Sequence, residues 1–167
     1  MPTKPSQGNG AMRIEQLMSR PVHTCRSSDV LSVPAQQMWD HDVGAIPVID
    51  DRDRLVGIVT DRDICMAALL QGKPLHAIAV ATVMTPNVHT CEVDDTVETA
   101  EQLMKLKQVR RVPVVAEGQH PVGILSLNDI AREASASSKK NGSERQVVQT
   151  LAAISAPRAH ALQRTSS

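Results

Sequence analysis

The chain shows the same order of apolar and polar segments twice. In the first copy, a short apolar stretch at Val22–Cys25 precedes apolar positions at helical spacing. Two apolar runs then follow, Ala45–Ile49 and Leu55–Val59, separated by a polar turn, and a further helical pattern starts at Thr60 or Asp61. Short apolar runs between polar turns are typical of buried strands, and apolar residues three or four apart indicate one face of a helix. Each copy is therefore predicted to fold as strand, helix, strand, strand, helix, which is a mixed α/β (α+β) class.

An internal repeat accounts for this order. A shift of 66 positions aligns Met18–Ile64 with Met84–Ile130 without a gap, and 16 of the 47 paired residues are identical. The identities fall in blocks: Val22–Cys25 with Val88–Cys91, Pro47-Val48 with Pro113-Val114, Val56–Ile58 with Val122–Ile124, and Asp63-Ile64 with Asp129-Ile130. The chain is a duplicated unit of about 50 residues.

Local signals predict where some elements begin. We expect the first helix to start at Asp29 or Val30 and its counterpart at Thr96, whose hydroxyl suits a capping position. Pro47 suggests that its strand lies at a sheet edge or starts irregularly, because proline lacks the N–H of a ladder hydrogen bond. The apolar segments Met12–Leu17 and Leu75–Val83 are expected to be helical approaches to the two copies.

Composition shifts divide the chain into segments. The predicted organisation is a disordered leader at 1–11, a first domain at 12–70, a linker at 71–77, a second domain at 78–134, a flexible linker at 135–142, an amphipathic helix at 143–156 and a disordered tail at 157–167. In the last helix, Ser143 and Gln146 resemble a capping box. Its predicted apolar face consists of Val147, Val148, Leu151 and Ile154. This face either docks on its own domain or serves dimerisation and signalling.

Composition also limits the function classes. The 18 basic and 18 acidic side chains balance, whereas nucleic acid binders usually carry an excess of Lys and Arg that neutralises phosphates. Nucleic acid is therefore not an expected partner. No apolar run approaches the roughly 20 residues that span a bilayer, so no membrane span is expected. Three cysteines without a CxxC pair favour a reducing cytoplasm, and Trp39, the single aromatic residue, leaves a bound base mainly aliphatic walls.

Two equivalent segments carry the candidate chemistry, Gly57–Asp63 and Gly123–Asp129, each running from an expected strand into a helix. In the first, Thr60 offers a hydroxyl beside the free N–H groups of a helix start, which suits phosphate. Asp63 lies one turn along, and its carboxylate can accept hydrogen bonds from a vicinal diol such as that of ribose. The alternative is structural, because Thr or Ser often caps a helix and Asp often complements its dipole.

These segments, with an upstream apolar-Pro-Val strand in each copy, resemble the CBS (cystathionine-β-synthase) domain family, and the doubling resembles a Bateman module. The resemblance covers residues 12–134. It implies two β-α-β-β-α units related by pseudo-twofold symmetry, binding of adenosine nucleotides in two clefts between the units, and dimerisation through the CBS helices into a disc.

Matching positions carry the family's site roles onto this chain. The resemblance implies that Asp63 and Asp129 bind ribose and that the Thr60 and Ser126 hydroxyls lie on the phosphate side. The adenine would lie against the first strand of each unit and the backbone of its proline-containing strand. Those positions are Thr24, Cys25, Ala45, Ile46 and Pro47 in the first unit and Thr90, Cys91, Arg111, Val112 and Pro113 in the second.

The two copies differ beside these positions. Arg62 adjoins the ribose-binding carboxylate of the first copy, where the second has Asn128, and Arg110-Arg111 precedes the second proline strand, where the first has Gly44-Ala45. The planar donor fork of arginine suits phosphate. We therefore expect two competent but unequal sites. The alternative for Arg110-Arg111 is a solvated edge or a salt bridge between dimer subunits.

Cysteine and histidine raise a metal hypothesis. His23 with Cys25, and His89 with Cys91, are spaced so that each pair could offer a nitrogen and a sulfur to zinc. Alternation in a short strand is equally typical of core packing, and cysteine is among the most buried residue types. Core packing is the interpretation adopted for both pairs, and Cys65 is expected to be an inert packing residue. No metal site is predicted.

The functional hypothesis is a sensor rather than an enzyme, since no nucleophile elbow, P-loop or HExxH motif occurs. It would bind AMP, ADP or ATP, with NAD and S-adenosylmethionine as further candidates, and would require no cofactor. Binding would change its interaction with an unknown protein partner or its oligomeric state, a homodimer being expected. The alternatives are a stress-related interaction scaffold with no physiological nucleotide, and an enzyme or zinc protein.

Overall fold

The computed structural model describes residues 11–136 and 143–156, which form two compact units. One unit contains residues 19–90 and 113–124, and the other contains residues 11–18, 91–112, 125–136 and 143–156. The leader and tail predicted for the two ends lie outside the described residues, except for Ala11. Among the described helices, none is both long and apolar enough to cross a bilayer.

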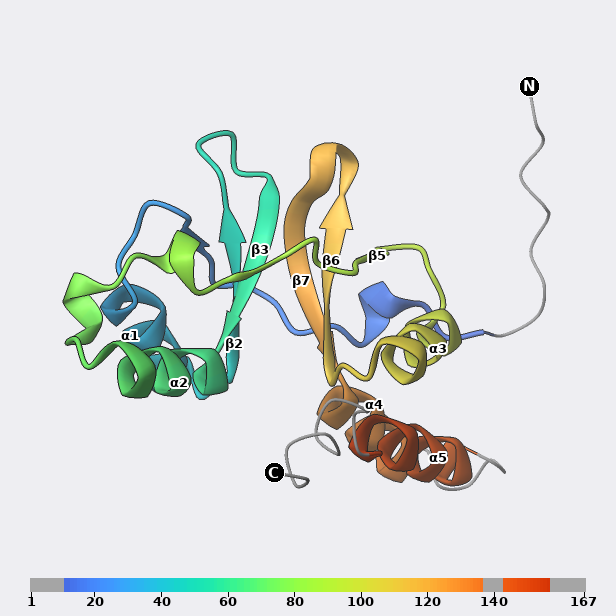
Figure 1. Cartoon of the computed structure of the whole chain (residues 1–167). Helices are drawn as coiled ribbons and strands as arrows, with labels where there is room; N and C mark the ends of the chain where they lie inside the picture. The colour runs from blue at the N-terminus through green and yellow to red at the C-terminus, as the bar shows by residue number, and fades with distance from the viewer. Residues whose placement is uncertain (1–10, 137–142, 157–167) are drawn as a thin grey trace. The chain divides into compact units, whose positions relative to one another are not determined.

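The first repeat has the predicted order of elements. It consists of β1 (Cys25–Arg26), α1 (Ser32–His41), β2 (Ala45–Ile49), β3 (Leu55–Thr60) and α2 (Asp61–Gln71). The sheet has the order β1-β2-β3-β4, in which β1 runs parallel to β2 and the other neighbours are antiparallel. The added strand β4 (Thr85–Pro86) comes from the segment that follows α2. Figure 1 shows α1 and α2 against β2 and β3.

Two details of the first repeat differ from expectation. Helix α1 begins at Ser32, because Val30 is held in a β-bridge with Ala79 and Leu31 is the capping residue. Strand β2 is not an edge strand, since it lies between β1 and β3. However, β1 pairs with β2 only from Val48 onward, so Pro47 has a partner strand on one side alone, where it faces Ile58. This placement tolerates the missing N–H of proline.

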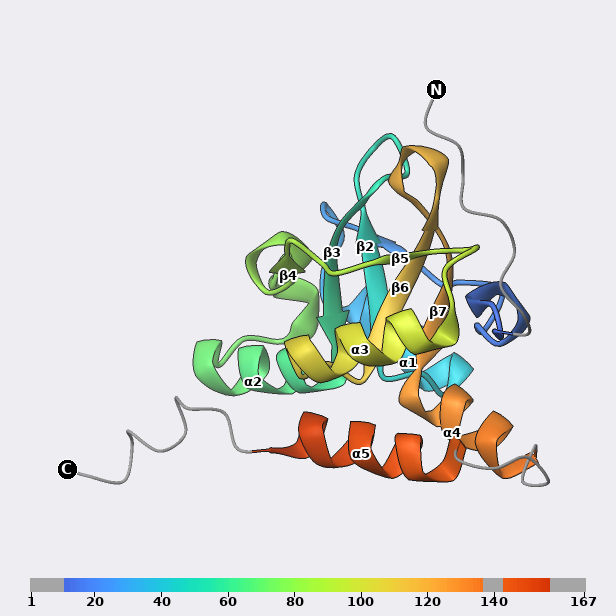
Figure 2. The same ribbon diagram turned by 90° about the vertical axis from the view of Figure 1, so that its right-hand side faces the viewer.

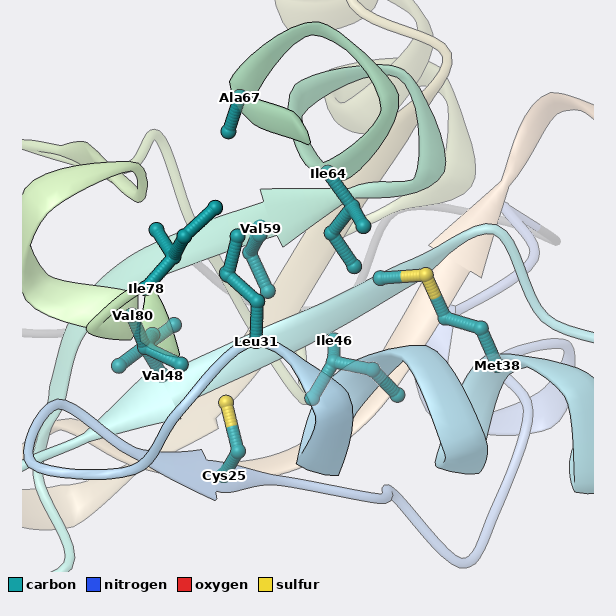
Figure 3. Close-up of a cluster of buried hydrophobic side chains, with 10 residues drawn as sticks. All are labelled: Cys25, Leu31, Met38, Ile46, Val48, Val59, Ile64, Ala67, Ile78 and Val80. Atoms are coloured by element: carbon teal, nitrogen blue, oxygen red, sulfur yellow. The ribbon is translucent and has the colours of Figure 1, made fainter. Parts of the chain in front are cut away.

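The core of the first repeat is aliphatic, as the scarcity of aromatic residues requires. Figure 3 shows its buried cluster, in which side chains from the sheet meet side chains from the helices and from the segment after α2. Its members are Cys25, Leu31, Met38, Ile46, Val48, Val59, Ile64, Ala67, Ile78 and Val80. Ile46 faces Val59 in the β2–β3 register, and neither side chain is exposed. This pair anchors the strands that lead to the candidate site.

The second repeat confirms the duplicated order. It consists of β5 (Cys91–Glu92), α3 (Val97–Lys107), β6 (Arg111–Ala116), the 3-10 turn η4 (Glu117–Gln119), β7 (His120–Ser126) and α4 (Leu127–Ala136), with sheet order β5-β6-β7. Thr96 caps α3 as predicted, because its hydroxyl accepts a hydrogen bond from the Thr99 N–H. Helix α4 continues through Ser135 and Ala136, where a linker was expected.

The two approach segments are short 3-10 turns rather than α-helices, and each packs on the repeat that it does not precede. Turn η1 (Ile14–Gln16) lies against the start of α3: the N–H of Ile14 donates to the Asp95 carbonyl, and Arg13 forms a β-bridge with Thr96. Turns η2 (Leu75–Ala77) and η3 (Val80–Thr82) lie against the start of α1, where the Val80 N–H donates to the Asp29 carbonyl. Ile14 and Val80 are fully buried, so both turns complete a core.

Helix α5 (Ser143–Ser155) packs on α3 and α4 (Figure 2). Its buried residues are Thr150 and Ile154, whereas Val148 and Leu151 are exposed, so the predicted apolar face is wrong in part. The helix instead satisfies a buried carboxylate. Gln146 donates to Glu101 Oε2 at 2.6 Å, and the Thr150 hydroxyl lies 3.5 Å from Oε1.

The Glu101 carboxylate is the partner of Gln146, which the sequence placed in a capping box with Ser143. That capping box stays a prediction, because the residues directly before Ser143 lie outside the described ranges. Burial raises the pKa of Glu101, while Lys105 and the hydrogen bonds from α5 act in the opposite direction. A buried carboxyl group is costly without partners, and this cost explains why a polar stripe of α5 faces inward. Of the alternatives for this helix, docking on its own domain is the one observed.

Candidate functional site

The junction of β3 and α2 is built around a reciprocal cap. The backbone N–H and the hydroxyl of Thr60 both donate to Asp63 Oδ2, at 2.9 and 2.7 Å, and the Asp63 N–H donates to Thr60 Oγ1 at 3.2 Å. Asp63 Oδ1 receives no hydrogen bond from the described residues. The carboxylate is half-buried. It is therefore held in a fixed orientation with one oxygen open to a hydroxyl donor.

The proline strand lies directly beside this cap. Ala45 is the Cα partner of Thr60 in the β2–β3 register, and the Asp61 N–H donates to the Gly44 carbonyl at 3.4 Å. The side chains of Ala45, Ile46 and Pro47 are buried. These three residues are buried as whole residues, backbone included, so the segment borders the cap without an exposed surface of its own. The structure brings Ala45, Thr60 and Asp63 together in one place, with Arg62 exposed on the first turn of α2.

Gln37 on α1 contacts Thr24, one of the predicted site residues, and the sequence did not single it out. Its Nε2 donates to the carbonyl of Thr24 at 3.1 Å, and its Oε1 is buried without a partner among the described residues. Gln37 thus fixes the residue expected beside the adenine, and Leu103 stands at the equivalent place in the second repeat. Nothing in the pattern of apolar positions marks Gln37, because it lies on a partly buried helix flank.

The Cys25 side chain points into the core cluster (Figure 3).

The junction of β7 and α4 repeats the cap with a difference. The Ser126 N–H and hydroxyl donate to Asp129 Oδ2 at 2.9 and 2.6 Å, and the Asp129 N–H donates back at 3.2 Å. Here, however, Asp129 Oδ1 accepts a hydrogen bond from the Arg132 guanidinium, and the two side chains form an ion pair. Asp129 is only 5% exposed. Both oxygens of the second carboxylate are therefore engaged.

Arg132 was missed by the sequence interpretation, although a signal exists. Residues three apart on a helix are neighbours on its surface, so an Asp followed by an Arg at this spacing predicts an ion pair. Met66 is the equivalent residue of the first repeat and cannot form one. The two junctions therefore differ at Arg132 as well as at the positions of Arg62, Arg110 and Arg111, which the sequence marked.

The second proline strand also reaches its junction. The Leu127 N–H donates to the Arg110 carbonyl at 2.9 Å, the same contact that Asp61 makes with Gly44 in the first repeat. Arg110 is exposed and Arg111 is half-buried, while Val112 and Pro113 are buried. Cys91 is buried and Thr90 is half-buried. The main chain of Arg110 thus lies next to the cap, as Gly44 does in the first repeat.

The cysteines of the two His/Cys pairs, Cys25 and Cys91, are buried, which agrees with core packing. Burial, followed by the nearby carboxylate Asp29, raises the pKa of the Cys25 thiol to about 12, and burial raises that of Cys91 to about 11. The His23 ring stacks on His41 with centroids 3.5 Å apart, and burial and His41 lower the pKa of His23. Within the described ranges, no three His, Cys, Asp or Glu side chains are grouped to hold a metal.

The expectation for Cys65 is wrong. Its side chain is exposed and carries a free thiol. Its neighbours Ile64 and Ala67 form the buried face of α2, and the 100° rotation per helical residue turns position 65 away from that face. The helical period of α2 would have predicted this exposure.

Comparisons with known proteins agree with this architecture. The sequence model of the CBS domain family matches residues 14–70 and 80–136. Hypoxic response protein 1 of Mycobacterium tuberculosis is 32% identical over 86% of this chain and 94% of its own length. YlbB of Bacillus subtilis is 36% identical over 71% of this chain and 80% of its own length.

Two solved structures of CBS proteins are similar to this chain. One is the CBS domain pair of protein MJ0100 in complex with 5′-methylthioadenosine and S-adenosyl-L-methionine, with a TM-score of 0.69 and 30% identity over 78% of this chain and 100% of that one. The other is Hypoxic Response Protein I with two coordinated zinc ions, with a TM-score of 0.65 and 32% identity over 72% of this chain and 98% of that one. The ligands belong to those proteins.

Proposed function

Because this chain belongs to the CBS domain family and carries two tandem copies of the domain, we propose that it is a non-catalytic regulatory module that binds an adenosine-containing ligand. The observation that carries the proposal is the Asp63 carboxylate, held by Thr60 with Oδ1 open beside the backbone of β2. A carboxylate oxygen with two vacant lone pairs matches the two hydroxyls of a ribose diol. The complex of the MJ0100 domain pair with two adenosine derivatives supports this ligand class.

The charges at the start of α2 bear on whether the ligand carries a phosphate group beyond its ribose. Asp61 and Asp63 both lie in the first turn, and the Thr60 hydroxyl proton is directed at Asp63. These features disfavour a phosphate, whereas the N–H groups of the helix start and the exposed Arg62 favour one. AMP, ADP and ATP are therefore candidate ligands, and so are 5′-methylthioadenosine and S-adenosylmethionine, which are less negatively charged.

A thermal-shift series with these five compounds tests the proposal. A ligand that binds only the folded chain at about 100 times its Kd should stabilise it by about 2.7 kcal/mol and raise the Tm by about 5–10 °C. The 2′-deoxy analogue of the best compound is the matched control, and it should lose most of the shift because the diol is incomplete. If none of the five compounds shifts the Tm, the protein is better described as an interaction scaffold.

A ligand at the junction can regulate only by favouring one conformation over another. It would touch the end of β3, the first turn of α2 and the adjacent half-buried Gly44, so its binding would bias the position of α2. Large exposed apolar side chains gather on the helices of the first repeat: Val33, Trp39, Met66, Leu69 and Leu70. The equivalent helices of the second repeat, α3 and α4, pack against α5, which covers part of their surface. We propose that α1 and α2 form the interface of a homodimer and that ligand binding changes this interface.

Trp39 offers a direct test, because it is 83% exposed on α1 and Lys105 is its counterpart in the second repeat. Trp39→Lys should convert a dimer into a monomer in light scattering, since buried Trp residues often dominate interfaces. Leu106→Lys is the matched control, on α3 and 75% exposed, and should leave the mass unchanged. A Trp39→Lys variant with the same mass as the wild-type dimer, or a monomeric wild type, contradicts the proposed interface.

A further inference from the structure

The two junctions share a cap but differ at one oxygen. In both repeats, the backbone N–H and the hydroxyl of Thr60 or Ser126 donate hydrogen bonds to Oδ2 of the aspartate. The aspartate N–H donates a hydrogen bond to that hydroxyl oxygen. Oδ2 is thereby saturated in each repeat, because a carboxylate oxygen offers about two lone-pair sites. Any diol must therefore be recognised by Oδ1. Within the described part of the chain, that atom accepts no hydrogen bond in Asp63, whereas in Asp129 it is bound by Arg132.

We infer that Arg132 is a specificity-determining residue, which closes the second junction to a ribose diol and makes the first repeat the stronger ligand site. This inference rests on the proposed function and deepens it. Arg132 occupies Oδ1 with a charge-assisted hydrogen bond, which is stronger than one from a neutral hydroxyl. A ribose diol needs both lone-pair sites of Oδ1, so one of its two hydroxyls must displace this hydrogen bond.

Burial and exposure set the size of the effect. The Asp129 side chain is 6% exposed, so the carboxylate cannot turn to water for a substitute partner, whereas the Arg132 side chain is 76% exposed and can swing into solvent. The second junction is therefore weakened rather than abolished. Displacing one charge-assisted hydrogen bond corresponds to a loss of affinity of roughly tenfold.

The opposite role for Arg132 predicts the opposite sign. If the guanidinium recognised a ligand phosphate or simply attracted anions, its removal would weaken binding. If it closes the carboxylate, its removal strengthens binding at the second junction. An uncharged ligand separates the two roles most cleanly, and 5′-methylthioadenosine is uncharged and carries the complete diol.

The internal repeat supplies matched substitutions. Arg132→Met places the first repeat's residue in the second, and Met66→Arg places the second repeat's residue in the first. Met66 is 41% exposed on α2, three residues after Asp63, so Met66→Arg disturbs no core. Because Met66 also lies in the proposed homodimer interface, light scattering must show the same mass for this variant as for the wild type, and Arg132→Met, on α4, is the primary test. Ser135→Ala, at an exposed position of α4, is the control for a change on that helix.

Calorimetric titration of 5′-methylthioadenosine into the full chain is the experiment. We expect a strong first site and a second site weaker by roughly tenfold in the wild type, two sites within about threefold of each other in Arg132→Met, and a first site weakened by roughly tenfold in Met66→Arg. Ser135→Ala should match the wild type. Asp63→Asn combined with Arg132→Met should retain one site, which assigns the strengthened site to the second junction.

The outcomes distinguish this inference from the proposed function. Equal sites in the wild type that do not change in Arg132→Met, or a second site that weakens in Arg132→Met, overturn the role of Arg132 and leave the proposed function standing. A wild type that does not bind together with an Arg132→Met variant that gains one site upholds the role of Arg132 and overturns ligand binding at the first junction. Absence of binding in every variant overturns both.

Discussion

Asp63→Asn should weaken binding of the adenosine-containing ligand by about 100-fold, or about 2.8 kcal/mol. The asparagine oxygen can replace Oδ2 as the acceptor for the Thr60 N–H and hydroxyl. Its amide nitrogen then stands where Oδ1 stood, so a donor faces the two ribose hydroxyls in place of an acceptor. The cap survives while the acceptor is lost. Titration of the best compound from the thermal-shift series measures the change.

Asp129→Asn is the matched control for this prediction, because both oxygens of Asp129 are already engaged within the chain. We expect it to change the affinity of the strong site by less than about threefold, since an independent site contributes little to it. Equal losses of ligand affinity in Asp63→Asn and Asp129→Asn would show that the two junctions contribute equally to binding. An Asp63→Asn variant that binds as the wild type does would remove the ribose assignment.

Ile46→Ala should lower the free energy of unfolding by about 2–5 kcal/mol, the second large effect. Ile46 is fully buried in β2 opposite Val59, within the cluster that unites sheet and helices (Figure 3). Truncation leaves a cavity that the packed aliphatic neighbours cannot fill. Because a domain of this size is stable by only about 5–15 kcal/mol, the loss is a large share of the total. Urea denaturation followed by circular dichroism gives the value.

The second repeat provides the graded control. Val112 occupies the position equivalent to Ile46 and is also fully buried, so Ile46→Val introduces a residue that the duplicated fold already accepts. It should cost about 0.5–1.5 kcal/mol. Val148→Ala, at a position 65% exposed on α5, should stay within about 0.5 kcal/mol of the wild type. A loss below 1 kcal/mol for Ile46→Ala would contradict the placement of this residue in the core.

Part of the candidate site could be predicted from residues that are close in sequence. The spacing of Thr60 and Asp63 predicted that the two side chains share one helical turn, and their reciprocal hydrogen bonds show that they do. These bonds also show that the structural alternative holds, because both residues cap α2. The cap and the proposed ligand role are compatible, since they use different oxygens of Asp63. Gln37 could not be found in this way, because its partner, Thr24, lies 13 positions away.

The sequence by itself determined the duplication, the order of strands and helices in each repeat, and the caps at Thr60, Thr96 and Ser126. These features follow from interactions within a few residues, namely the alternation of strands, the period of helices and hydrogen bonds three residues apart. Only the tertiary structure decided which repeat each approach turn completes and which face of α5 is buried. Ile14 meets Asp95, and Gln146 meets Glu101. Such pairs are brought together by the packing of whole elements, and the buried carboxylate of Glu101 selects a polar stripe that no count of apolar residues would choose.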